Sequence, residues 1–67
     1  MTPEEIDRCW AIAEKACTPK QLEVLDYFAR NYGAVRIGRI LGITPQAVQA
    51  RKAGGERRIQ AYKEEAA

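Results

Sequence analysis

The sequence predicts an all-α fold, a small bundle of four helices in a single domain over residues 1–67. Apolar residues recur every three or four positions, which is the spacing of one face of a helix. A chain of 67 residues has room for one small core, which three or four helices can enclose. Three Thr-Pro pairs mark helix starts and two glycines mark helix ends: the pairs are at 2–3, 18–19 and 44–45, and the glycines are Gly33 and Gly42.

The first helix is expected over residues 3–16, after the capping-box sequence Thr2-Pro3-Glu4-Glu5. Trp10 is interpreted as a core residue rather than a platform on which bases stack. The two cysteines are interpreted as small core residues, because their separation on one helix is too large for a disulfide. The chain has no histidine, so we expect no structural zinc site and no other cofactor. The predicted inner stripe of this helix is Ile6, Cys9, Trp10, Ala13 and Cys17.

The second helix starts with the same signal, Thr18-Pro19-Lys20-Gln21, in which Thr18 caps the helix and Gln21 reaches back to it. We expect this helix to end at Gly33, because the residue after a helix often has positive φ. Its predicted inner stripe is Leu22, Leu25, Ala29 and Tyr32, flanked by Val24 and Phe28.

Residues 34–53 have the pattern of a helix-turn-helix. The expected third helix, 34–41, has Ile37, Ile40 and Leu41 on one face, and Gly42 stops it. Ile43 is an apolar plug in the turn. Thr44 suits the N-cap of the next helix, and Pro45 suits its first position, where an N–H would have no partner. Two short helices joined in this way, with the inner face of the second carrying Val48, form the DNA-binding unit of many regulators.

Two groups of glycines raise questions about the last two helices. Gly38 lies inside the third helix, where it costs about 1 kcal/mol relative to alanine, so we expect close approach of the recognition helix there. Gly54-Gly55 would weaken the last helix by roughly 2 kcal/mol and could divide it, giving five helices. The spacing favours one continuous helix with a weak point, and Glu64 to Ala67 are expected to fray. Its inner face would carry Val48, Lys52, Gly55, Ile59 and Tyr62.

Charge divides the chain into two halves, although its net charge is only +2. Residues 1–33 have four basic and six acidic groups, a net of −2, whereas residues 34–67 have seven basic and three acidic groups, a net of +4. The basic half coincides with the helix-turn-helix pattern, as a surface facing phosphates requires. An ordinary solvated surface remains the alternative interpretation of the charge alone.

Residues 18–59 resemble the DNA-binding domain shared by LuxR-type regulators and the promoter-binding C-terminal domain of bacterial sigma factors. The resemblance implies a helix-turn-helix whose second helix enters the major groove. The chain departs from the family pattern at four positions: Arg36 replaces Glu, Gly38 replaces Ala, and Lys52 and Gly55 replace Leu and Ala. The matching residues are Thr18-Pro19, Gln21, Val24-Leu25, Ile37-Gly38, Ile40, Leu41-Gly42-Ile43-Thr44, Val48 and Ile59.

The recognition helix supplies candidate contacts to DNA bases: Thr44, Gln46, Gln49, Ala50 and Ala53. Glutamine pairs with adenine through two hydrogen bonds and an alanine methyl packs on thymine, so this set favours a site containing A·T pairs. The alternative is that glutamine and alanine are simply good helix formers on an exposed face. The candidate phosphate contacts are Arg36, Arg39, Arg51, Lys52, Arg57 and Arg58.

These features predict a cytoplasmic transcriptional regulator that binds specific sequences of double-stranded DNA. Because one such unit contacts about one half-site, a homodimer is expected, with Ile59, Tyr62 or the outer part of the first helix as candidate contacts. The short chain is typical of a stand-alone regulator from a phage or mobile element. The alternative is a protein-interaction module, a sigma-domain mimic that binds RNA polymerase or another regulator. No membrane span, signal peptide or catalytic constellation is expected.

Overall fold

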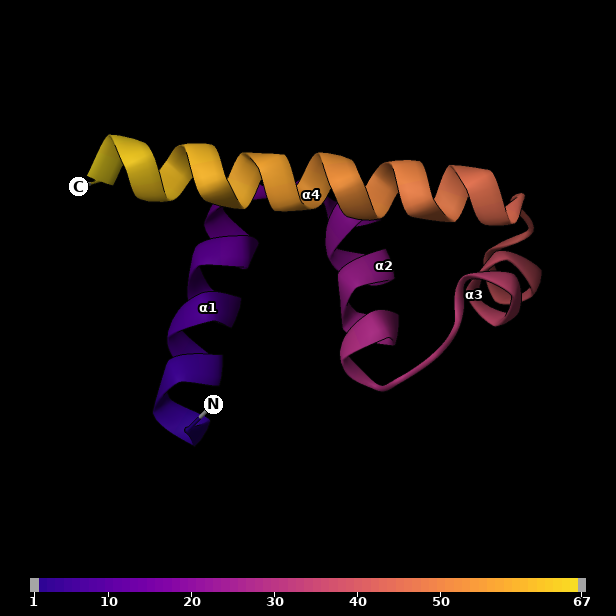
Figure 1. The fold of residues 1–67 in the computed structure, drawn as a ribbon, viewed down its shortest axis with the longest axis horizontal. Helices are drawn as coiled ribbons and strands as arrows, with labels where there is room; N and C mark the ends of the chain where they lie inside the picture. Colours follow the sequence, from indigo (N-terminus) through magenta and orange to yellow (C-terminus); the bar gives the residue numbers. More distant parts are fainter. Residues whose placement is uncertain (1, 67) are drawn as a thin grey trace.

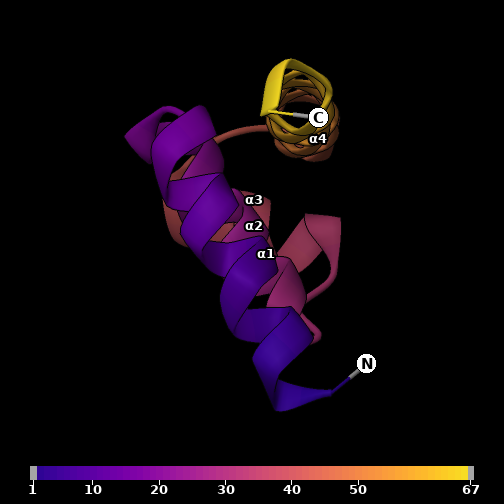
Figure 2. The same ribbon diagram turned by 90° about the vertical axis from the view of Figure 1, so that its left-hand side faces the viewer.

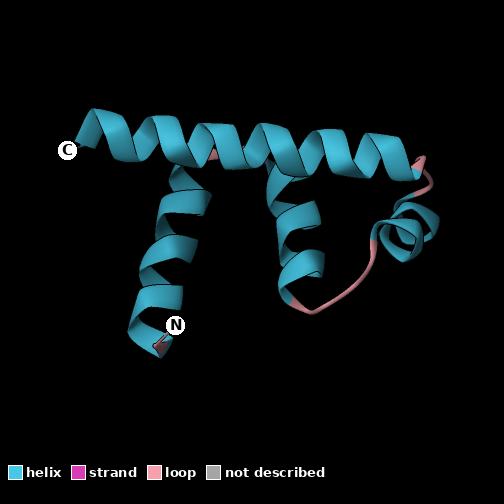
Figure 3. Cartoon of the chain, in the orientation of Figure 1, coloured by secondary structure: helices cyan, strands magenta, loops and turns pink. Residues whose placement is uncertain are grey.

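The computed structural model describes residues 2–66, apart from the side chains of Glu5, Ile6, Cys9 and Ala66. Over these residues the chain forms no strand, which confirms the predicted all-α class (Figure 3). The bounds of the first and third helices agree with those predicted from the sequence. The four helices of the described residues are α1 (Pro3–Ala16), α2 (Pro19–Ala29), α3 (Ala34–Leu41) and α4 (Pro45–Ala66).

The long helix α4 organises the molecule, because α1, α2 and α3 each pack on it (Figure 1). The C-terminal end of α1 and the N-terminal end of α2 meet α4 near its middle, and α3 lies beside its start. Seen along α4, the other three helices all lie on one side (Figure 2). One face of α4 is therefore left uncovered along the helix. None of the helices formed by residues 2–66 combines the length and apolar character needed to cross a bilayer.

The core is centred on Val24, Ile37 and Val48, which are fully buried and come from α2, α3 and α4. Val24 was expected beside the inner stripe of α2, not at its centre. This prediction was wrong because α2 packs on both α3 and α4, and Val24 is buried against Ile37 and Val48 of those two helices. The half-buried residues around the centre are Tyr27, Phe28, Tyr32, Ala34, Leu41 and Ile43.

Two other predicted core residues lie elsewhere. Trp10 is half-buried on α1 and is not part of the cluster around Ile37, because α1 packs mainly on α4 at the edge of the bundle. Among the described side chains of α1, Ala13 is the buried one, at 3% exposure. Ile40 was expected on the inner face of α3 but is 48% exposed, since it lies to one side of Ile37 where no helix covers it. The side chains of Ile6 and Cys9, also predicted for the core, lie outside the described residues.

The start of α2 agrees with the prediction, whereas its end does not. The Thr18 hydroxyl accepts a hydrogen bond from the Gln21 backbone N–H at 3.3 Å, and the Gln21 side chain accepts from the Thr18 N–H at 3.0 Å. The helix ends at Ala29, and Asn31 takes the left-handed conformation with φ 65°. Asparagine visits this region more readily than most residues. Gly33 was expected to have positive φ but has φ −81° and is the N-cap of α3.

Helix α4 is continuous through Gly54 and Gly55, as the spacing of its apolar residues favoured. A Cβ on Gly55 would lie 3.0 Å from Cδ1 of Leu25, so the absence of a side chain lets α2 approach α4 closely. The helix also continues through Glu64 and Glu65 to Ala66. Fraying from Glu64 was expected, so that prediction was wrong over the described part of the segment.

Candidate nucleic-acid interface

The turn between α3 and α4 is fixed by two glycines. Gly42 ends α3 in the left-handed conformation with φ 71°, and the Ile43 N–H donates to the Gly38 carbonyl at 2.9 Å. A Cβ on Gly38 would lie 2.6 Å from the Ile43 carbonyl oxygen and 3.5 Å from the nitrogen of Pro45, the first residue of α4. Gly38 was expected to allow close approach of the recognition helix. The closest contact is instead with the turn, at Ile43, and Pro45 at the start of α4 is farther away.

Thr44 caps α4 as predicted. Its hydroxyl oxygen accepts a hydrogen bond from the Ala47 backbone N–H at 3.1 Å, and its carbonyl accepts from the Val48 N–H at 3.1 Å. The side chain is exposed, and a hydroxyl that accepts one bond still has a proton to donate. Thr44 therefore fixes the start of α4 and offers a donor on the surface beside it.

The predicted base contacts of α4 share one exposed face. We call the residues Gln46, Gln49, Ala50 and Ala53 the outer stripe; all four are exposed, and they lie across the helix from the fully buried Val48. The spacing of three, four and seven positions places them in one row over about two turns. Amide and methyl groups, with no bulky side chain between them, make this surface flat and polar.

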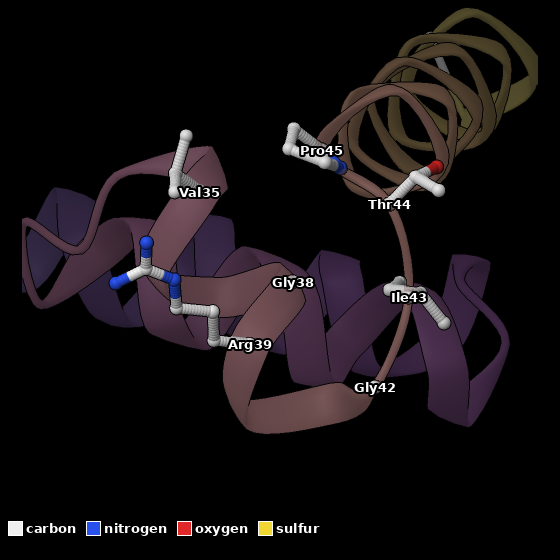
Figure 4. Close-up of a pocket in the computed structure, with 7 residues that line it drawn as sticks. All are labelled: Val35, Gly38, Arg39, Gly42, Ile43, Thr44 and Pro45. Atoms are coloured by element: carbon white, nitrogen blue, oxygen red, sulfur yellow. The ribbon is translucent and has the colours of Figure 1, made fainter.

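Two of the predicted phosphate contacts, Arg57 and Arg39, border the outer stripe, and two others on α4 do not. Arg57 follows Ala53 by four positions and continues the row, and it is exposed. Arg51 and Arg58 each follow a buried residue, Val48 or Gly55, by three positions, which places them about 60° from it on the inner flank of α4. Arg58 is accordingly near enough to Cys17 to lower the pKa of its thiol. Arg39 projects from α3 beside a cleft of about 450 Å³ (Figure 4). That cleft lies in the angle between the two helices and is lined by Val35, Gly38, Arg39, Gly42, Ile43, Thr44 and Pro45.

The other two predicted phosphate contacts point elsewhere. The Arg36 guanidinium lies 4.1 Å from the centre of the Tyr32 ring. Since Arg36 is two positions from Gly38, or about 200° around the helix, it is on the side of α3 opposite the turn. Lys52 lies on the inner side of α4, with its ammonium 5.0 Å from the centre of the Phe28 ring and 3.7 Å from the Glu56 carboxylate. The structure does not bring these two cations together with the outer stripe.

The distribution of acidic residues shows a feature that the net charges of the two halves of the chain did not reveal. No acidic residue lies between Asp26 and Glu56 in the sequence. These two carboxylates at the ends of the stretch are both engaged, Asp26 with Arg30 at 3.2 Å and Glu56 with Lys52 at 3.7 Å. Within residues 2–66, no ion pair involves Arg39, Arg51, Arg57 or Arg58. Arg39 beside the turn and Arg57 at the end of the outer stripe are therefore positive charges that no neighbouring carboxylate pairs with.

Cys17 lies where α1, α2 and α4 meet, and its role is structural. Its thiol donates to the Gly55 carbonyl over 3.4 Å, a weak hydrogen bond to the middle of α4. Burial raises the pKa of the thiol, and the Arg58 guanidinium lowers it by a smaller amount. The thiol is therefore protonated at neutral pH. Among residues 2–66, no group of three or more histidine, cysteine or acidic side chains is placed to hold a metal ion.

Comparison of this chain with models of protein families, with curated proteins and with solved structures gives no match. The likeness of residues 18–59 to LuxR-type and sigma-factor DNA-binding domains remains a prediction from the motif.

Proposed function

We propose that this protein binds double-stranded DNA in a sequence-specific manner by placing the outer stripe of α4 in the major groove. The observation that carries the proposal is a single surface. It is the uncovered and uncharged stripe of amides and methyls, presented by a fixed turn and bordered by Arg39 on one side and Arg57 at its end. Phosphates on both sides of a groove attract such a positive rim, while base edges need neutral donors and acceptors.

The outer stripe supplies contacts that distinguish base pairs. The amides of Gln46 and Gln49 can each donate to and accept from one adenine, and the methyls of Ala50 and Ala53 can pack on thymine. Thr44 adds a hydroxyl donor at the start of the helix. We therefore expect the preferred site to contain A·T pairs opposite the first two turns of α4.

The charges along α4 set the direction in which it enters the groove. Residues 46–53 span about 11 Å, which is close to the roughly 12 Å width of the major groove. Arg57 follows directly in the same row, where the helix would reach the phosphates, and Glu64 and Glu65 come near the end of the helix. Phosphates repel those carboxylates, so the C-terminal end of α4 points away from the DNA.

A transcriptional regulator is the role that fits a small unit of this kind, and the likeness to LuxR-type and sigma-factor domains supports it. One outer stripe covers only a few base pairs, so we expect a homodimer on two half-sites. Ile59 and Tyr62 are half-buried on the C-terminal half of α4, away from the outer stripe, and remain candidate dimer contacts.

Selection of bound sequences from a random duplex pool tests this proposal. The protein should enrich one motif containing A·T pairs, and a dimer should enrich it as two related half-sites. Gln49→Ala should remove the preference at one or two positions, at about 1–3 kcal/mol, because an adenine contact is lost. Gln60→Ala, an exposed amide two turns beyond the stripe, is the matched control and should leave the motif unchanged. If no motif is enriched, or if both variants act alike, the assignment of the outer stripe is wrong.

A further inference from the structure

The solvent-facing side of α3 has an unusual composition. We call Val35, Arg36, Arg39 and Ile40 the α3 outer face. Val35 is 55% exposed and Ile40 is 48% exposed, and they are the large hydrophobic residues that the described part of the chain leaves exposed. Single exposed aliphatic residues are common, but here both belong to one eight-residue helix. On that helix they flank two arginines.

Neither the core nor the turn explains this face. Ile37 is buried in the core, and Gly38 lies on the side of α3 that contacts the turn. Arg36 is held in place by Tyr32, whose ring lies 4.1 Å from the guanidinium carbon and 5.3 Å from the ring of Tyr27. A guanidinium stacked on an aromatic ring keeps its N–H donors at its edges, directed outward. Among residues 2–66, neither Arg36 nor Arg39 forms an ion pair.

We propose that the α3 outer face docks an acidic amphipathic helix of a protein partner. Carboxylates of that helix would pair with Arg36 and Arg39, and its aliphatic residues would cover Val35 and Ile40. Arginine is suited to carboxylates because its planar fork forms two parallel hydrogen bonds. The lack of any acidic residue from Tyr27 to Gly55 means that nothing on this side of the molecule repels such a partner.

DNA is the less suitable occupant of this face. Phosphates would pair with the arginines but would gain little from two exposed aliphatic side chains, which they would leave beside strongly hydrated groups. Arg36 and Ile40 also lie on the side of α3 opposite the turn, whereas the outer stripe belongs to α4. A partner helix on this face and DNA on the outer stripe therefore share only the edge of the cleft at Val35 and Arg39, which goes beyond the DNA binding proposed above.

The test uses a synthetic amphipathic helix with leucine on one face and glutamate on the other, titrated into isotope-labelled protein. Amide shifts should change along α3 and at Tyr32. Ile40→Gln keeps the charge of the protein and removes only apolar contact, so it should weaken binding of the peptide about fivefold. It should leave binding of duplex DNA unchanged. Ala61→Gln, at an exposed position of α4, is the matched control and should affect neither ligand.

Three results would overturn the proposal. The first is peptide binding that Ile40→Gln does not weaken, or shift changes centred outside α3. The second is an equal loss of duplex binding in Ile40→Gln, which would mean that this face contacts DNA. The third is self-association that Ile40→Gln abolishes, which would make a second copy of the chain the occupant. Thermal melts of both variants should stay close to that of the unchanged protein, so that unfolding does not produce any of these results.

Discussion

Two glycines allow close contacts near α4, and the two contacts differ in the kind of atom that faces the glycine. At the start of α4, Gly38 of α3 faces a backbone oxygen, that of Ile43, which a Cβ would meet at 2.6 Å. At its middle, Gly55 faces a side-chain methyl, that of Leu25, which a Cβ would meet at 3.0 Å. A carbonyl in a tight turn cannot move without moving the chain, whereas the end of a leucine can change rotamer. The first contact therefore fixes a geometry, and the second only adjusts a packing distance.

This difference matters for the proposed function. The contact at Gly38 sets where α4 begins and thus where the outer stripe lies relative to Arg39. The contact at Gly55 sets how closely α2 crosses α4, on the buried side of the helix away from the stripe. Substituting alanine at each glycine isolates the two effects, because one methyl group is added each time.

Gly38→Ala should have the largest effect. The added methyl overlaps the Ile43 carbonyl, so the turn must shift, and we expect a loss of about 2–3 kcal/mol in the free energy of unfolding. Denaturant or thermal unfolding measures it, and DNA binding of the folded fraction should also weaken. The control is Gly33→Ala, where φ is −81° and nothing lies within 4 Å of the new methyl. If the control is just as destabilised, the contact at the turn is not the cause.

Gly55→Ala should have a smaller effect, within about 1 kcal/mol of the unchanged protein. The gain in helix propensity of about 1 kcal/mol opposes the crowding against Leu25. A double-mutant cycle with Leu25→Ala gives the sharper measurement. Because the second substitution removes the obstructing methyl groups, the two should couple favourably, by at least about 0.5 kcal/mol. Strictly additive free energies would show that Leu25 does not limit the approach of α2.

Gly54→Ala should have a small effect, and unlike Gly38→Ala it should stabilise the protein. Its new methyl would meet only Nε2 of Gln21, at 3.0 Å, which is the far end of a flexible side chain. We expect stabilisation by about 0.5–1 kcal/mol, because alanine loses less entropy than glycine in a helix. Thermal melts of Gly54→Ala and Gly55→Ala under one set of conditions allow direct comparison. Destabilisation by Gly54→Ala would indicate that the helix is interrupted at the glycine pair.

The difference between local contacts and contacts between helices also explains which parts of the fold could be predicted from the sequence. Local backbone chemistry was sufficient at Thr18, Gly42 and Thr44, where a cap or a left-handed residue involves only neighbours a few positions away. It was insufficient at the end of α2, because Asn31 and Gly33 both tolerate positive φ and local rules do not choose between them. The burial of Val24 and the exposure of Ile40 depend on where other helices lie, and that information is not local.

Some residues of the candidate site could likewise be placed from local sequence, and others could not. The outer stripe follows from helical spacing opposite Val48, and the continuity of α4 keeps Arg57 in its row. Charge alone gave no direction for Arg36 and Lys52, which stack on Tyr32 and Phe28 instead. Tyr32 lies in the segment between α2 and α3, and Phe28 belongs to α2, so no pattern within α4 could have indicated the pairing of Lys52.

The central claim is that the arginines around the outer stripe hold DNA, and the salt dependence of duplex binding tests it most directly. Fluorescence anisotropy with a labelled duplex should give a log–log slope of about −2 for each bound chain, as expected for two phosphate contacts. Arg57→Ala should reduce the magnitude of the slope by about 1, whereas Lys63→Ala, exposed near the end of α4, should not change it. Binding that does not depend on salt, or no binding at low salt, would contradict the account.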